Sequence, residues 1–536
     1  MRVPLSTSFD LEFWEHKLAR YHDRHIIDFM RFGWPINFAG NFSPAPFRGN
    51  HNSAHTFASH VDEFIQSELH HGSLFGPFDA NPFHPQHCFI SPLQTVPKKG
   101  SPHKRRVVVD LSFPSNQSVN SGISNSTYLD TDIDFELPSV DTFAHLIRQK
   151  GKGCFLFKRD LSRAYRQIPI DPHDYNLLGI SWNEQLYFDS ALPFGLRSAA
   201  FICQSVSSAL SFMQISDGFD CINYIDDFAG AESSVSKAVH AFDNLATIFS
   251  RAGICEAKDK AVAPCQVMSF LGVGFNTVSM TMFVTAERLA ELHDLSSLYI
   301  NASKITKAQL QSLIGKLMFA AKCVPSSRIF IHRLLNVLRK LKHRSYRIRI
   351  DSHMKRDLFW WSKFLPAFNG ISIIPDLSWS EPDSVIQCDA CLTGAGGAFG
   401  NSAFHRRFPV FILEQNLHIN ALELLTVTVA LKLWAPQLAG KKIQILCDNL
   451  VSVQVINKGN CSNEFMQTCM REFIFILSLH NVQLRAVHIS GESNRLADLL
   501  SRVHLNHKYR DTLRTLAPNL SLTDVTDDIF KFQNRW

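Results

Sequence analysis

The chain has 536 residues, of which 45% are hydrophobic and 19% charged, a composition typical of globular proteins and unlike that of disordered chains. One hydrophobic core does not extend over such a length, so we expect three or more domains. The net charge of +6 is too small to argue by itself for a nucleic-acid partner.

The 12 cysteines are scattered along the chain, as expected for a reducing compartment. Cys388 and Cys391 form a C-x-x-C pair, but no second pair lies nearby, so no zinc site is expected. The N-terminus lacks a basic-then-apolar signal pattern, and no apolar run comes near the roughly 18 residues of a membrane span. We therefore expect a soluble intracellular protein in the cytoplasm, the nucleus or both, which is not secreted and has no membrane partner.

Residues 1–84 are assigned to an N-terminal helical leader. The apolar residues between Leu11 and Met30 repeat with helical spacing on either side of a break at His22, which predicts two short amphipathic helices. A further helix is predicted from Ala58 to Leu69. This segment contains no constellation of catalytic side chains.

Residues 92–112 are predicted to form two strands joined by a basic turn. Five Lys and Arg residues fall within the nine positions 98–106 and are offset by no acid. Such a turn suits a nucleoside triphosphate or a phosphate backbone. Taken alone, the segment fits a solvated basic turn better.

Two adjacent carboxylates, Asp226 and Asp227, lie within the apolar segment 221–230, which favours a hairpin. Acids side by side repel each other, and a divalent cation relieves that repulsion. A polar hairpin turn explains the pair equally well when it is judged alone. A third acid, Asp160, follows the apolar run 154–157, which reads as a buried strand. Two strands can bring these acids together to hold two metal ions roughly 3.5–4 Å apart, as phosphoryl transfer requires.

The order and spacing of three segments resemble the motif series of reverse transcriptases: Phe157-x-x-Asp160-x-x-x-Ala164-Tyr165, then Leu192-Pro193-Phe194-Gly195-Leu196, then Tyr224-Ile225-Asp226-Asp227. The resemblance implies the fingers and palm of a right-hand polymerase over residues 85–275. It also implies attack of a primer 3′-hydroxyl on the nucleotide α-phosphate, with Asp160 and Asp226 binding both metals and Asp227 assisting. The leader more weakly resembles the segment that precedes the polymerase in DIRS-like retrotransposons.

The same resemblance implies substrate-binding roles for Lys99, Arg106, Tyr165, Phe194, Gly195 and Lys260. A surface lysine explains Lys260 at least as well, and a core tyrosine is the alternative for Tyr165. The sequence departs from the family at two positions. Ser112 stands where retroviral enzymes usually have Arg, and Ala200 stands where many relatives have Pro.

Residues 276–380 are predicted to be a helical thumb and connection. Apolar residues between Leu310 and Ala321 repeat with helical spacing. The stretch 333–356 holds nine Lys and Arg residues and one acid, which suits either a solvated helix face or contacts with the phosphates of a duplex. Residues 375–382 are predicted to be a linker.

A second set of acids occupies residues 381–503, at predicted strand ends and helix starts: Asp389, Glu423, Asp448 and Asp498. Such positions converge on one edge of a mixed sheet and can hold two Mg²⁺. Each acid alone fits an N-cap or surface residue better. Together, their order and the spacing from His488 to Asp498 closely resemble ribonuclease H domains, which implies a product-release role for His488 and a supporting role for Asn494.

The sequence therefore predicts an α+β multidomain protein, a right-hand polymerase followed by an α/β ribonuclease H-like domain and a C-terminal tail, 504–536. The predicted function is RNA-directed DNA polymerase with ribonuclease H activity, from a DIRS-like or LTR-type retrotransposon. The implied cofactor is Mg²⁺, two ions at each site, with Mn²⁺ as an alternative. The implied partners are an RNA template, a DNA primer, the RNA–DNA hybrid and deoxynucleoside triphosphates. A domesticated or polymerase-inactive nucleic-acid-binding protein or nuclease is the alternative, and the oligomeric state is left open.

Overall fold

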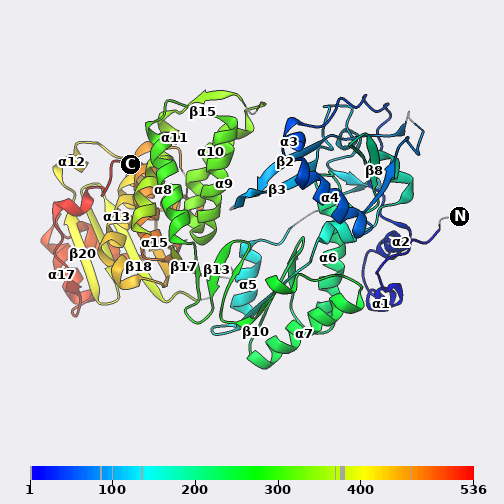
Figure 1. Ribbon diagram of the computed structural model, residues 1–536. Coiled ribbons are helices and arrows are strands. Elements are labelled where there is room, and N and C mark those ends of the chain that lie inside the picture. The colour runs from blue at the N-terminus through cyan, green and yellow to red at the C-terminus, as the bar shows by residue number, and fades with distance from the viewer. Residues whose placement is uncertain are drawn as a thin grey trace. The chain divides into compact units, whose positions relative to one another are not determined.

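The computed structural model describes residues 3–84, 87–98, 101–133, 137–343, 345–368, 370–374, 381–459 and 461–536. Lys99, Arg344 and most of the predicted linker 375–382 lie outside the described residues. The chain divides into two compact units, Met1–Phe270 and Leu271–Trp536 (Figure 1). Both units contain helices and sheets, so the chain is α+β as expected.

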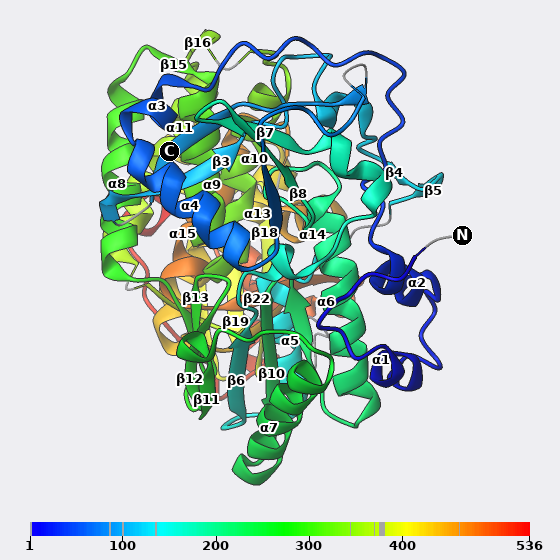
Figure 2. The same cartoon turned by 45° about the vertical axis from the view of Figure 1, so that its right-hand side comes forward.

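The first unit is built around an antiparallel sheet of order β11-β6-β10-β9. Helices α5 and α7 pack against this sheet, and α6 packs against β9 (Figure 2). Local signals explain the helix starts, since Ser139 forms a capping box with Thr142 at α5 and the Ser234 side chain caps α7. The elements are α5 (Val140–Lys150), β6 (Phe155–Asp160), α6 (Ala199–Ser216), β9 (Ile222–Tyr224), β10 (Asp227–Glu232), α7 (Val235–Arg251), β11 (Val262–Cys265) and β12 (Val267–Phe270).

Three smaller sheets complete this unit. The predicted basic hairpin is confirmed as β2 paired with β3, and the other two sheets have the order β1-β8-β7 and the pair β4-β5. Their bounds are β1 (Leu74–Phe78), β2 (Leu93–Lys98), β3 (Ser101–Val109), β4 (Thr127–Tyr128), β5 (Thr131–Asp132), β7 (Gly179–Trp182) and β8 (Gln185–Asp189). Short 3₁₀ turns include η2 (Val119–Gly122), η3 (Ala164–Gln167), η4 (Pro172–Leu177) and η5 (Lys258–Lys260).

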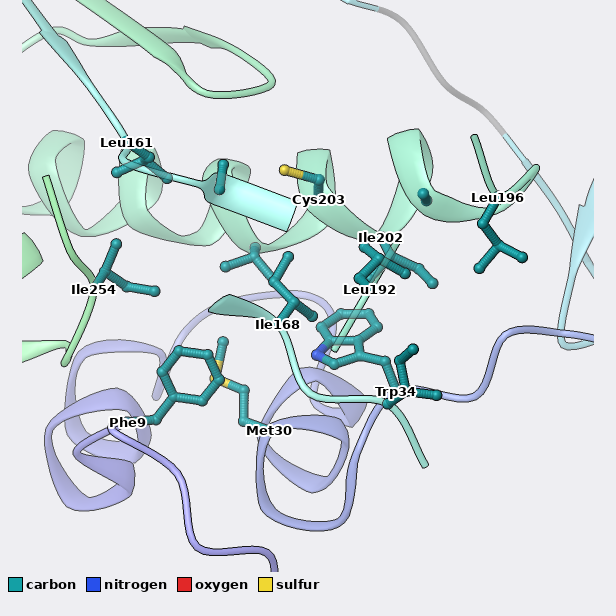
Figure 3. Close-up of a cluster of buried hydrophobic side chains, with 14 of the residues drawn as sticks. Phe9, Met30, Trp34, Leu161, Ile168, Leu192, Leu196, Ile202, Cys203 and Ile254 are labelled. Carbon is teal, nitrogen blue, oxygen red and sulfur yellow. The ribbon is translucent and has the colours of Figure 1, made fainter. Parts of the chain in front are cut away.

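The leader forms the predicted helices and packs into the core of the first unit. Its helices are α1 (Leu11–Lys17), α2 (His25–Phe32), α3 (Asn52–Thr56) and α4 (Ala58–His70). Phe9, Met30 and Trp34 lie in one hydrophobic cluster with side chains from the central sheet region and α6 (Figure 3). The Trp14 indole also donates a 2.9 Å hydrogen bond to the carbonyl of Ala252. The leader is therefore a structural part of this unit.

The second unit begins with a mainly helical region that also contains short strands. β15 pairs with β16, and β14 pairs with β13 and β17. The basic stretch contains Arg347 and Arg349, which alternate with Ile348 along a strand. The elements are β13 (Val273–Asn276), β14 (Thr281–Phe283), α8 (Ala286–Asn301), β15 (Lys304–Thr306), α9 (Lys307–Cys323), η6 (Pro325–Arg328), α10 (Ile329–Arg339), β16 (Arg347–Arg349), α11 (Ser352–Ala367) and β17 (Ile371–Ile373).

The rest of the second unit is a six-stranded mixed sheet of order β22-β21-β18-β19-β20-β23, with parallel pairing of β21 to both β18 and β22. Gly394, Gly396 and Gly397 lie within β19, the strand that pairs with β18. The elements are β18 (Ser384–Cys391), β19 (Gly394–Phe399), β20 (Ser402–Arg407), α12 (Val410–Leu413), α13 (Ile419–Trp434), η7 (Ala435–Leu438), β21 (Lys442–Cys447), α14 (Leu450–Lys458), α15 (Glu464–Leu479), β22 (Gln483–His488), α16 (Arg495–Arg502), α17 (His507–Leu516), β23 (Ser521–Leu522) and η8 (Asp527–Phe530).

Among the described residues, one helical stretch is long and apolar enough to cross a membrane by length and composition alone. This stretch, Ile419–Leu438, is the exception to the expectation that no apolar run would come near that length. Because 72% of it is buried inside the structure, it has the environment of a core helix.

Candidate active sites

The first set of predicted catalytic acids meets at one end of the β6–β10 ladder. Asp160 is the last residue of β6, not a residue beyond it as predicted, and lies directly opposite Asp227 at the start of β10. Asp226 lies in the turn between β9 and β10, and its carbonyl accepts a 2.9 Å hydrogen bond from the amide of Leu161. The antiparallel register therefore brings all three carboxylates together.

The turn that presents Asp226 is strained and is held by a residue that the sequence analysis missed. Ile225 has φ +53°, a value rarely adopted by β-branched residues. Buried Gln204 on α6 accepts a 2.7 Å hydrogen bond from the Ile225 amide and donates a 3.2 Å bond to the Asn223 carbonyl. The sequence signal for this role was a glutamine on the apolar face of a predicted helix, where a polar side chain needs a hydrogen-bond partner.

The acids of this cluster repel one another, and nearby positive charge relieves that repulsion. Burial raises the pKa of Asp160 and of Asp226, and repulsion from the neighbouring acids raises both further. Lys260 Nζ lies 2.8 Å from Asp160 Oδ1, and Lys158 Nζ lies 3.1 Å from Asp227 Oδ1. Lys158 was also missed, although it precedes Asp160 on the same strand face. Buried, mutually repelling carboxylate oxygens fit hard divalent cations such as Mg²⁺.

Two predicted substrate-binding aromatic rings lie next to this cluster. The Tyr165 ring, in η3, is 4.7 Å from the Phe194 ring between centroids, and 53% of Phe194 is exposed. Gly195 follows with φ +92°, a conformation that favours glycine. Asn120, which was not predicted, fixes this turn by donating to the Gly195 carbonyl at 2.9 Å and accepting from the Arg197 amide at 2.8 Å.

Neighbouring arginines in the basic hairpin face different surroundings. Arg106 on β3 is exposed. The guanidinium of Arg105 instead lies 3.8 Å from the centroid of the Phe57 ring and donates to the Thr95 carbonyl at 2.8 Å. Arg105 therefore serves packing, and Arg106 is the one of the two that is open to a ligand.

The second set of acids converges in the six-stranded sheet region. Ligand atoms of Glu423 on α13, Cys447 at the end of β21, and Asp448 all lie within 4.8 Å of one another. Asp389 lies within β18 opposite Gly396, and its Oδ2 accepts a 2.5 Å hydrogen bond from Ser501 Oγ on α16. The predicted placement of Asp389 at a strand end was wrong by two residues, because β18 continues to Cys391.

Burial governs the charge state of this second cluster. Burial raises the pKa of Asp389 to about 7, and repulsion from Asp448 and Asp498 contributes. Burial likewise raises the pKa of Glu423 to about 9, with repulsion from Asp389 and Asp448. Carboxylates held together at this cost are suited to cation binding.

Supporting residues surround the second cluster. His488 Nε2 lies 3.1 Å from the carbonyl oxygen of Asp448 and is exposed. Asn494 is buried and donates a 2.9 Å hydrogen bond to the Cys388 carbonyl. Gly396 lets α16 approach the sheet, because a Cβ there would lie 2.4 Å from the Ser501 nitrogen. Ser501 and Cys447 were not predicted, since their roles depend on contacts across the fold.

Comparison with known families finds a match for part of the first unit. Residues 96–275 match the family described as Reverse transcriptase (RNA-dependent DNA polymerase). These residues are therefore similar to reverse transcriptases. The chain is also similar to the retrovirus-related Pol polyprotein from transposon 297 of Drosophila melanogaster, with 21% identity over 466 residues. The match covers 83% of this chain and 40% of that polyprotein, so the chain spans well under half of its relative's length.

Several solved structures are similar to this chain. The foamy viral protease-reverse transcriptase dRH in complex with ds DNA covers 91% of this chain and 83% of that chain, with 17% identity and a TM-score of 0.49. The foamy viral protease-reverse transcriptase in complex with RNA/DNA hybrid covers 90% and 64%, with 16% identity and a TM-score of 0.45.

Proposed function

We propose that the chain is an RNA-directed DNA polymerase with a second, ribonuclease H activity. The observation that carries the polymerase assignment is the register of Asp160 opposite Asp227, with Asp226 in the intervening turn, inside a domain of the reverse transcriptase family. The substrates are an RNA template, a DNA primer and deoxynucleoside triphosphates. The source is a retrotransposon of DIRS-like or LTR type, and the protein acts inside the cell.

The residues of the first site divide into metal ligands and substrate contacts. Asp160 and Asp226, assisted by Asp227, would hold Mg²⁺ or Mn²⁺, which lowers the charge barrier to displacement at the nucleotide α-phosphate. Exposed Arg106 binds the triphosphate. Lys260, whose side chain is 56% exposed, is free to turn from Asp160 towards phosphate oxygens. Tyr165 and Phe194 form the wall against the sugar and base.

The second site would hydrolyse the RNA strand of the RNA–DNA hybrid. Asp389, Glu423, Asp448 and Asp498 would hold two divalent cations, which lower the pKa of bound water and stabilise the leaving oxygen. Asn494 fixes the local backbone, and exposed His488 assists product release. The support for this activity is the mutual repulsion of four acids from separate elements: Asp389 on β18, Glu423 on α13, Asp448 after β21 and Asp498 on α16.

A primer-extension assay tests the proposal. The purified chain is given a DNA primer on an RNA template, with Mg²⁺ or with EDTA, and Asp226→Asn serves as the inactive control. We expect extension that requires the metal and is lost in Asp226→Asn. Hybrid binding without any extension by the unmodified chain would instead support the alternative, a polymerase-inactive nucleic-acid-binding protein or nuclease.

A further inference from the structure

A buried ion cluster joins the leader to the polymerase site. Glu68 on α4 is buried, and its Oε2 accepts hydrogen bonds from Arg163 Nη2 at 2.7 Å and from Arg166 Nε at 2.8 Å. Arg166 Nη2 in turn lies 2.7 Å from Asp189 Oδ1. Two carboxylates thus balance two guanidiniums, and three of these four side chains are almost fully buried.

The cluster connects the two chain segments that carry the aromatic wall. Arg163 and Arg166 flank Tyr165 in sequence, and Asp189 ends the strand that leads to Phe194. Arg166 also donates a 3.2 Å hydrogen bond to the carbonyl of Ala191, which lies between that strand and Phe194. The contact between the Tyr165 and Phe194 rings, 4.7 Å between centroids, is therefore made by two segments that share one ionic anchor.

The backbone at Arg163 needs this anchor. Its φ of +50° is uncommon for a residue other than glycine, and such a conformation persists where surrounding contacts hold it. Besides Glu68, Arg163 donates a 3.2 Å hydrogen bond to the hydroxyl of Ser73, which follows α4. Removing the Glu68 charge would leave two guanidiniums beside one carboxylate in a buried site, an arrangement that is strongly unfavourable.

We propose that Glu68 is a positioning residue that sets the geometry of the nucleotide pocket and thereby the selection of deoxynucleotides. This inference rests on the proposed polymerase function. Glu68 touches neither metal ligands nor the two rings in the contacts described above, and acts through Arg163 and Arg166. It also gives the leader, which carries no polymerase motif, a defined role in the first site.

The test compares two isosteric changes on one helix. Glu68→Gln removes the buried charge, and Glu63→Gln makes the same chemical change at an exposed position of α4. Single-nucleotide incorporation on an RNA template gives KM and kcat for a deoxynucleotide and for the matching ribonucleotide. We expect Glu68→Gln to raise the deoxynucleotide KM about ten-fold and to raise the ribonucleotide share of incorporation, since small displacements at a reacting site have large effects. Affinity for the primer–template should stay unchanged, and Glu63→Gln should match the unmodified chain.

Melting curves accompany the kinetics, with assays run well below the melting temperature of each variant. A stable Glu68→Gln protein with normal KM and a normal ratio of ribonucleotide to deoxynucleotide incorporation would overturn the proposal and leave Glu68 a purely structural residue. If Glu68→Gln fails to fold, Glu68→Asp and Arg163→Lys weaken the same contacts and must show the same KM and ratio changes. An unmodified chain that extends no primer would overturn the proposed function, and this inference with it.

Discussion

At the scale of single residues, both sites show carboxylates kept together against their own repulsion. In the first site, lysine ammonium groups lie within 3.1 Å of Asp160 and Asp227. In the second site, Ser501 donates to Asp389, and Arg502 pairs with Asp498 at 2.7 Å. Such arrangements concentrate negative charge in a way that suits the binding of a cation.

Tyr165→Ala separates a sugar-selecting role from a packing role. A ribose carries one extra hydroxyl, and a close aromatic wall rejects it by overlap, at roughly 1–3 kcal/mol, or about ten- to a hundred-fold in rate. We expect deoxynucleotide incorporation to persist in Tyr165→Ala while ribonucleotide incorporation rises. Tyr175→Ala is the control, because that ring packs on Phe75 at 5.1 Å between centroids. An unchanged ratio with a lower melting temperature would make Tyr165 a core tyrosine.

Without a bound cation, the repulsion among the acids of the second cluster should lower the melting temperature of the folded chain. Because burial raises the pKa of Asp389 to about 7, its ionised form destabilises the folded chain when no cation is bound. We expect Asp389→Asn to raise the melting temperature in EDTA by about 2–4 °C, on the order of 1 kcal/mol for a unit of this size. Added Mg²⁺ should stabilise the unmodified chain more than the variant. Asp528→Asn, at an exposed site, is the control, and an equal response to Mg²⁺ would contradict the prediction.

At the scale of elements, the basic residues of the stretch 333–356 divide into two groups. Arg333 and Arg356 pair with Asp357 and Glu464, so their charges are used within the unit. Arg347 and Arg349 on β16 are exposed and project from a strand rather than from the predicted helix. The element that presents these two side chains is thus a short two-stranded ladder.

Neutralising Arg347 and Arg349 together tests phosphate contacts by β16. If both contact the backbone, Arg347→Gln with Arg349→Gln should weaken hybrid binding equally for all sequences and reduce the salt slope by about two units, roughly one per contact. Binding constants measured at several salt concentrations give the slope. Lys17→Gln with Arg31→Gln is the control, since both side chains are already paired with acids. A salt slope equal to that of the unmodified chain would show that Arg347 and Arg349 are solvated and contact no phosphates.

The segment 504–536 is also an integral element of the second unit. β23 pairs with β20, and the Trp536 indole donates to the buried carboxylate of Glu472 on α15. The Trp536 ring lies 5.3 Å from that of Phe475. We expect Trp536→Ala to destabilise the unit by about 3 kcal/mol, since a buried aromatic ring and a hydrogen-bond donor are lost together. Chemical denaturation measures the free energy of unfolding, and Leu516→Ala, at an exposed position, is the control. Equal stability of the two variants would contradict the prediction.

At the scale of the whole molecule, the two carboxylate clusters belong to different compact units. Asp160, Asp226 and Asp227 lie in Met1–Phe270, whereas Asp389, Glu423, Asp448 and Asp498 lie in Leu271–Trp536. Each cluster is assembled from strands and helices of its own unit. We therefore expect a substitution in one cluster to leave the residues of the other cluster in place.

Asp448→Asn should abolish cleavage of hybrid RNA and leave DNA synthesis largely intact. Asp226→Asn should do the reverse, because each change removes a metal ligand from one cluster only. Both activities are measured on one preparation of each variant, with a melting curve to show that the protein is folded. Loss of both activities from either change in a folded protein would disprove separable sites.

The sequence alone singled out the carboxylates that the structure brings together in each unit, although β6 and β18 extend further than predicted. Alternation and helical spacing are local signals, so the β2–β3 hairpin, the strands around Asp160 and Asp448, and the helices of the leader could be predicted. The order and spacing of the motifs from Asp160 to Asp227 can also be recognised from the sequence without knowledge of the fold. The register that places these two residues opposite each other joins β6 to β10, which are far apart in sequence, so only the tertiary structure decided it.

Only the tertiary structure decided which residues hold the segments around the first site in place. Gln204 on α6, Asn120 before β4 and Glu68 on α4 reach their partners from distant parts of the chain, and no local periodicity marks such contacts. Gly394 and Gly396 leave room for Ser501 of α16 beside β19, a contact that the sequence does not show. Side chains whose partners lie nearby in sequence were therefore predictable. Side chains whose partners lie far away in sequence were not, because their contacts depend on how distant elements pack.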